Sequence, residues 1–190
     1  MEPVIGIEPS KECPEKKSLL ARLLHAYRSD FCFVPRSGRV LEVPCELIRE
    51  DIGSVAIPIY IHSAMNGSQE LVLGVDPGER HVGIAALVGD YEIIRETIVP
   101  ESFPLLLSVL SRFFAKVIIY IGDYPDWKYV GLDLHLGDRV VVRKLREKEV
   151  KKVCQVVSDG DKGLSRHARD AYFLLLSGVA ETLRKRLAHM

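Results

Sequence analysis

The sequence predicts an α/β protein: a central five-stranded mixed sheet flanked by helices, preceded by a small α+β segment over residues 1–65. Two apolar runs, LVLGV (71–75) and KVIIYIGD (116–123), carry this prediction, because continuous apolar strands are typical of parallel pairs buried on both faces. An acid follows or closes each run. Between them lies a helical pattern, which supplies the crossover that a parallel pair requires.

The pattern of residues 1–65 predicts one helix and three short strands. Leucines at helical spacing indicate an amphipathic helix over 16–27. FCFVPRSGRVLEVP (31–44) predicts two strands around a turn, and SVAIPIYIHSA (54–64) predicts a third, irregular or at an edge because of Pro58. The polar stretch MNGSQE (65–70) is the expected domain boundary.

From residue 71 onward, strands and helices follow one another with clear ends. The first strand stops at Asp76-Pro77-Gly78, since proline cannot donate to a sheet ladder. Ser165 is a suitable N-cap for the last helix. The other expected elements are strands over 81–89, 91–99, 116–123 and 139–145, and helices over 102–114, after 146 and over 165–187.

Four polar residues are the candidate catalytic site. A right-handed crossover places Asp76 and Asp123 at the carboxyl ends of neighbouring parallel strands, where open α/β sheets bind ligands. Two such carboxylates repel unless a cation lies between them, and Mg²⁺, or Mn²⁺ in its place, prefers oxygen ligands. His167 and Asp170, three residues apart on a helix, can point into the same site. Asp170 is expected on the core-facing side of this helix, and because a carboxylate without a partner is costly to bury there, a functional role is favoured.

Two segments carry a family resemblance. LVLGVDPGERHVGIAAL (71–87) resembles the first hairpin of the RuvC and YqgF families, and RHARDAYFLLLSG (166–178) resembles the RuvC C-terminal helix. The resemblance implies a ribonuclease H-like domain over 71–190 that cleaves nucleic acid with divalent metal. It implies Asp76, Asp123 and Asp170 as metal ligands, with Asp123 standing where RuvC usually has Glu. His167 would ligate the metal or position water.

Basic residues concentrate near the candidate site although the chain has no net charge. Ten basic and four acidic residues lie between positions 139 and 169. Such a segment can track a phosphate backbone with salt-dependent affinity, and we expect DNA as the partner in preference to RNA. The resemblance to RuvC implies substrate-facing lysines at Lys148, Lys151, Lys152 and Lys162. With Arg80 and Arg166, these are the expected nucleic-acid-binding residues.

The expected function is that of a metal-dependent nuclease acting on structured nucleic acid, either branched DNA such as a Holliday junction or an RNA precursor. The alternative is an inactive binding or assembly module, which is favoured by the histidine at 167, the shortened middle of the domain and the neutral net charge. Two departures from RuvC count against junction resolution in particular. Only about fifteen residues separate Asp123 from the next strand, too few for RuvC's long dimerisation helix, and residues 1–65 have no RuvC counterpart. Asp76 could also simply cap its turn, and Asp126 could replace Asp123. An ATPase of the actin/Hsp70 type needs two such halves and is excluded by length.

Composition adds weaker expectations. The four cysteines form no CxxC pair, which argues against structural zinc and favours buried free thiols. One Asn and two Gln indicate a thermophilic source, in which intracellular disulfides are less rare. No signal peptide or membrane span is recognisable, so we expect a cytoplasmic protein without a membrane partner, and a homodimer is the oligomer to test for.

Overall fold

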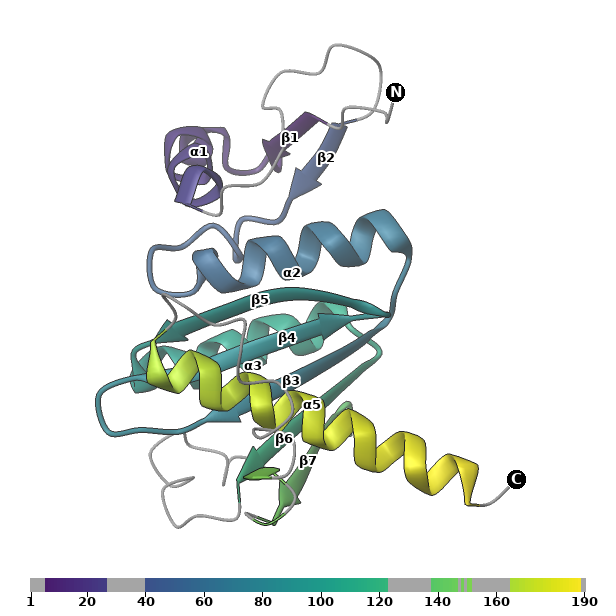
Figure 1. The fold of residues 1–190 in the computed structure, drawn as a ribbon. Coiled ribbons are helices and arrows are strands. Elements are labelled where there is room, and N and C mark those ends of the chain that lie inside the picture. Colours follow the sequence, from purple (N-terminus) through teal and green to yellow (C-terminus); the bar gives the residue numbers. More distant parts are fainter. Residues whose placement is uncertain are drawn as a thin grey trace. The chain divides into compact units, whose positions relative to one another are not determined.

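Five strands in the second half of the chain form one mixed sheet with the order β5-β4-β3-β6-β7 (Figure 1). The structure, a computed structural model, describes residues 6–26, 40–122, 138–146, 148, 150, 151 and 165–188, without the side chains of residues 92 and 93. The chain divides into two units, Met1–Gly67 and Ser68–Met190. The sheet belongs to the second unit.

The elements of the second unit confirm the predicted order. The strands are β3 (Glu70–Asp76), β4 (Val82–Val88), β5 (Tyr91–Ile98), β6 (Lys116–Gly122) and β7 (Val140–Leu145). The helices are η2 (Pro100–Ser102), α3 (Phe103–Phe113) and α5 (Arg166–Leu187). Most of the helix expected after residue 146 lies outside the described residues.

The directions of the strands also agree with the prediction. β3 pairs antiparallel with β4 and parallel with β6, with Val75 opposite Ile121. β6 pairs parallel with β7. The carboxyl ends of β3 and β6 therefore lie side by side at one edge of the sheet, which is the arrangement that the two apolar runs predict.

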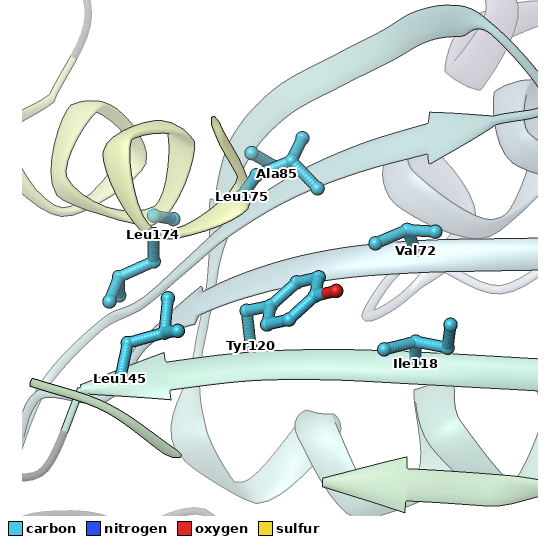
Figure 2. Close-up of a cluster of buried hydrophobic side chains, with 8 residues drawn as sticks. Val72, Ala85, Ile118, Tyr120, Leu145, Leu174 and Leu175 are labelled. Atoms are coloured by element: carbon cyan, nitrogen blue, oxygen red, sulfur yellow. The ribbon is translucent and has the colours of Figure 1, made fainter. Parts of the chain in front are cut away.

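α3 and α5 lie on opposite faces of this sheet (Figure 1). Because side chains alternate along a strand, Val72, Gly74 and Asp76 point to the same face. The α5 face holds a buried cluster, part of which is shown in Figure 2. Its members are Val72, Ala85, Ile118, Tyr120, Leu145, Ala171, Leu174 and Leu175. This packing fixes α5 on the sheet and with it the residues of its first turn.

Glycines allow α5 to approach the sheet closely. A Cβ at Gly74 would lie 2.0 Å from the carbonyl oxygen of Ala171, and a Cβ at Gly83 would lie 1.9 Å from that of His167. From the helix side, a Cβ at Gly178 would lie 2.2 Å from the Tyr120 ring. No larger residue fits these three crossing points without moving backbone or a buried ring.

The first unit contains β1 (Gly6–Pro9), η1 (Pro14–Lys16), α1 (Lys17–Ala26), β2 (Val40–Val43) and α2 (Gly53–Asn66). α1 confirms the predicted helix. β2 is a strand as predicted, but it pairs parallel with β1, a strand that the sequence analysis missed. The other strand of the expected hairpin lies outside the described residues.

The predicted strand over 54–64 is wrong, because this segment is helix α2. A short apolar run cannot be assigned by periodicity alone, and a helix buried on several sides loses its polar stripe. Pro58 lies inside the helix rather than at a sheet edge. The Asn66-Gly67 pair ends it, since Gly67 has a φ of 70° and its N–H donates to Ser63 O at 2.8 Å.

Two cysteines are not free thiols. Cys13 and Cys45 form a disulfide with a Cα–Cα distance of 5.9 Å and a sequence separation of 32. Closing a loop of this length stabilises a fold by about 3–4 kcal/mol in the chain-entropy model. The other two cysteines, Cys32 and Cys154, lie outside the described residues.

Candidate active site

Asp76 is the last residue of β3 and points toward the first turn of α5. The start of that helix is fixed by Ser165, whose Oγ accepts a hydrogen bond from Ala168 N at 3.1 Å, as predicted for the N-cap. This places His167 in the first turn. Its Nδ1 lies 2.6 Å from Asp76 Oδ2, a distance at which the ring N–H donates to the carboxylate.

Two glycines of the strand-turn motif determine where His167 lies. A Cβ at Gly78 would be 2.7 Å from His167 Cε1 and 3.2 Å from Nε2, so the ring rests against this glycine. Gly83, opposite Asp76 on β4, contacts the His167 backbone. The motif that suggested a metal site therefore also contains the residues that admit the histidine.

The Asp76 carboxyl is largely withdrawn from water, with 18% of its side chain exposed. Burial raises its pKa, and the negative charge of Asp170 adds to this effect. The His167 hydrogen bond, the His167 charge and the Arg166 charge act in the opposite direction and do not cancel it. The ionised form of Asp76 is thus disfavoured mainly because the carboxyl has lost contact with water.

Asp170 lies one turn along α5 and is more exposed than predicted. We expected a carboxylate facing the core without a partner, but 36% of the side chain is exposed. Its oxygens lie 3.5 Å from Arg166 Nε and 3.9 Å from Arg169 Nε. Asp170 therefore acts on Asp76 through its charge, and the cost of burying it is not an argument for function.

The fourth candidate, Asp123, lies outside the described residues, as does Asp126. β6 ends at Gly122, the residue before Asp123, beside the end of β3. Within the described part of the chain, no group of three or more His, Cys, Asp or Glu residues is arranged to hold a metal ion. Asp76, His167 and Asp170 thus form part of a site at most.

The predicted nucleic-acid-binding residues lie on different elements. Arg80 is exposed in the turn after Asp76, and Arg166 is exposed at the start of α5, where it pairs with Asp170. Lys148 and Lys151 are exposed beyond β7. Lys152 and Lys162 lie outside the described residues. Arg80 and Arg166 therefore lie at the same end of the sheet as Asp76.

Similarity to known proteins is found among solved structures. No protein-family model matches the sequence, and no curated protein matches it. Among solved structures, T. thermophilus RuvC in complex with a Holliday junction substrate is similar, with a TM-score of 0.45 and 16% identity over 61% of this chain and 96% of that chain.

The class of the second unit follows from its sheet. A hairpin of β3 and β4 extended by β5, with β6 and β7 added parallel to β3, is a ribonuclease H-like arrangement, as predicted. None of the described helices is long and apolar enough to cross a membrane.

Sequence reasoning missed two sets of residues. It noted Gly74, Gly78 and Gly83 only as parts of a motif, because their contacts with α5 lie about ninety positions away in the sequence. It also missed a polar group on the far half of α5, around Tyr120 and Thr182. No local pattern marks these two residues, since each is ordinary in its own strand or helix.

Proposed function

We propose that Ser68–Met190 is a divalent-metal-dependent nuclease that hydrolyses phosphodiester bonds in structured nucleic acid. The observation that carries this proposal is the Asp76 carboxyl: a half-buried acid at a strand end, hydrogen bonded to His167 and close enough to Asp170 for its charge to act on it. An acid with a perturbed pKa beside a specific charged partner is typical of functional sites.

The donor chemistry fits a hard cation. Asp76 and Asp170 provide carboxylate oxygens, the ligands that Mg²⁺ and Mn²⁺ prefer, and burial makes Asp76 favour a positive neighbour. Asp123 would add a third carboxylate from the neighbouring strand. When bound there, such a cation would make a water nucleophilic at neutral pH and offset phosphate charge.

The chain's own residues have separate roles in this proposal. Asp76 provides an anchored carboxylate oxygen, and His167 holds that carboxylate in one orientation through its Nδ1 hydrogen bond. Such supporting hydrogen bonds position ligands and raise their affinity for metal. Asp170, held by Arg166 and Arg169, contributes charge at the same end of the sheet.

Nucleic acid would approach this end of the sheet along basic residues. Arg80 and Arg166 are the described candidates closest to Asp76 in the chain or in the fold, and Lys148, Lys151, Lys152 and Lys162 would extend the contact. We propose DNA, with a branched structure such as a four-way junction preferred to an RNA precursor.

A cleavage panel tests the proposal. Four-way junction, fork, duplex, single-stranded DNA and structured RNA would be incubated with Mg²⁺ or Mn²⁺, and with EDTA. The Asp76→Asn variant should lose cleavage by about a thousandfold, of the order seen when a catalytic group is removed, while keeping its fold and nucleic-acid affinity. Asp90→Asn, which removes an exposed acid from the β4–β5 turn, is the matched control and should cut normally.

An inactive nucleic-acid-binding module is the second candidate, and one observation favours it. Asp76 and Asp170 both have protein partners, His167 for the first and arginines for the second, so a purely structural role would satisfy them. If the wild type binds the panel without metal and cuts none of it, this second function is correct and the nuclease is not.

A further inference from the structure

A polar cavity of about 390 Å³ lies over β6 and β7, on the same face of the sheet as α5. Its position is separate from Asp76: Thr182 is fifteen residues beyond His167 on α5, which corresponds to about 22 Å along a helix. The residues that line it are Tyr120, Arg143, Lys144, Glu181, Thr182 and Lys185. Three of them are cations and one is an anion.

Tyr120 connects the cavity to the core. The residue is 2% exposed and its ring belongs to the buried cluster of Figure 2. Its hydroxyl nevertheless lies 2.6 Å from Thr182 Oγ1. A buried hydroxyl is unfavourable unless it is hydrogen bonded, and phenylalanine would fill the same space. Gly178 of α5 has no side chain, which leaves space for this ring. The ring of Tyr120 thus packs in the core, whereas its hydroxyl forms its hydrogen bonds with residues that line the cavity.

Tyr120 and Thr182 together orient the side chain of Arg143. Its Nη1 donates to Thr182 Oγ1 at 3.1 Å and to the Tyr120 hydroxyl at 3.4 Å, and its guanidinium carbon lies 6.0 Å from the Tyr120 ring centroid. Both hydrogen bonds are donated by the same nitrogen. A guanidinium held by one edge presents its other N–H groups in a fixed fork, which matches the oxygens of a phosphate.

The charge of the cavity is positive. Lys185 pairs with Glu181 one turn earlier on α5, so one cation is balanced inside the lining. Arg143 and Lys144 then leave an excess of two positive charges among the lining residues. An anion with several oxygens is the ligand that this lining would bind, and the volume falls in the range of small-ligand sites.

We propose that this cavity binds a phosphate group, independently of the Asp76 site. The phosphate could belong to a nucleic-acid backbone or to a free phosphate compound. If it belongs to the substrate, an inference that rests on the proposed nuclease function, the contact lies about 6 base pairs from the site of cleavage, since a duplex rises about 3.4 Å per pair.

A charge-matched pair of double variants tests the proposal. Arg143→Gln/Lys185→Gln removes two cations of the lining. Arg184→Gln/Arg186→Gln removes two exposed cations from the same helix end that do not line the cavity. Binding of a 20-base-pair duplex would be measured in EDTA at several salt concentrations, with thermal unfolding as the check on folding.

The cavity variant should bind the duplex about tenfold more weakly, with a slope of log K against log salt that is less steep by about 1, as for one lost phosphate contact. The control should lose less than threefold. Equal losses in both double variants would overturn a backbone contact. Cleavage at saturating substrate, measured separately, should persist in the cavity variant. A wild type that cuts nothing would contradict the nuclease proposal, whereas the binding measurements alone decide the phosphate proposal.

Amide chemical shifts of the wild type distinguish the two sources of phosphate. Inorganic phosphate should shift the resonances of residues 143, 182 and 185. Duplex should shift the same resonances if the ligand is a backbone phosphate. Shifts with phosphate and none with duplex would support a free phosphate compound at this cavity. No shift with either would overturn the proposal.

Discussion

α5 meets the sheet at two polar places, here called the acidic end, for Asp76 and Asp170, and the basic end, for Arg143 and Lys185. In its first turn, His167 is hydrogen bonded to Asp76, and burial, aided by the charge of Asp170, raises the pKa of the Asp76 carboxyl. In its last turns, Thr182 and Lys185 face Arg143, where cations are in excess. The same helix therefore contributes to both proposed sites, the cation site in its first turn and the phosphate site in its last turns.

The difference lies in the backbone as much as in the charges. At the acidic end, Gly78 and Gly83 are on the sheet side and let the helix backbone and His167 come close. At the basic end, the glycine is on the helix, and it makes room for the Tyr120 ring. Close approach thus brings an imidazole to a carboxylate at one place, and a phenol to an arginine at the other.

Moving α5 away from the sheet would disturb both places at once. Gly74→Ala puts a Cβ 2.0 Å from Ala171 O, and we expect it to reduce the free energy of unfolding by about 3 kcal/mol, as overpacking against backbone does. Gly67→Ala is the contrast, because a Cβ there meets nothing within 4 Å and only the φ of 70° is strained, at about 1 kcal/mol. Urea unfolding followed by circular dichroism would compare them; equal losses would mean that α5 can shift freely.

Removing the imidazole would weaken the acidic end alone. His167→Gln should lower the affinity for Mn²⁺ by about 10- to 100-fold, because the carboxylate loses its supporting ring. Calorimetric titration would measure this, with His81→Gln, an exposed histidine of the β3–β4 turn, as the matched control. Duplex affinity in EDTA should not change. An unchanged Mn²⁺ affinity would remove His167 from the site.

The pH dependence of stability gives the smallest effect. Burial raises the pKa of Asp76, so its protonated form favours folding and this contribution is lost as the pH rises through the folded-state pKa. Without metal, Asp76→Asn should gain in melting temperature over the wild type as the pH increases from 3 to 7. Asp90→Asn serves as the reference. A gap that narrows with rising pH would mean that Asp76 is stabilised as an anion by the protein itself.

The second unit could be predicted well because its signals are local. Continuous apolar runs identify β3 and β6, Pro77 ends the first of them, and Ser165 marks the start of α5. The pairing of β3 with β6 then follows from a general rule of handedness. Each of these features can be predicted from a short stretch of sequence together with the handedness rule.

The fold of the first unit and the surroundings of the site residues could not be predicted as well, because they depend on contacts between residues far apart in the sequence. α2 was mistaken for a strand because its apolar residues are buried on several sides, so no polar stripe marks a helix. The Cys13–Cys45 bond joins residues with no recognisable spacing. Asp170 was expected to be buried, because the sequence shows the helix face but not how near its first turn lies to water.

The central claim is that Asp76, His167 and Asp170 belong to one divalent-cation site, and paramagnetic broadening by Mn²⁺ tests it most directly. Substoichiometric Mn²⁺ would be added to isotope-labelled wild type and to Asp76→Asn, and amide signals would be compared. We expect broadening centred on residues 76, 83, 167 and 170 of the wild type, absent from the variant, with the resonances around Thr182 sharp. Broadening spread over surface acids, or unchanged in Asp76→Asn, would contradict the claim.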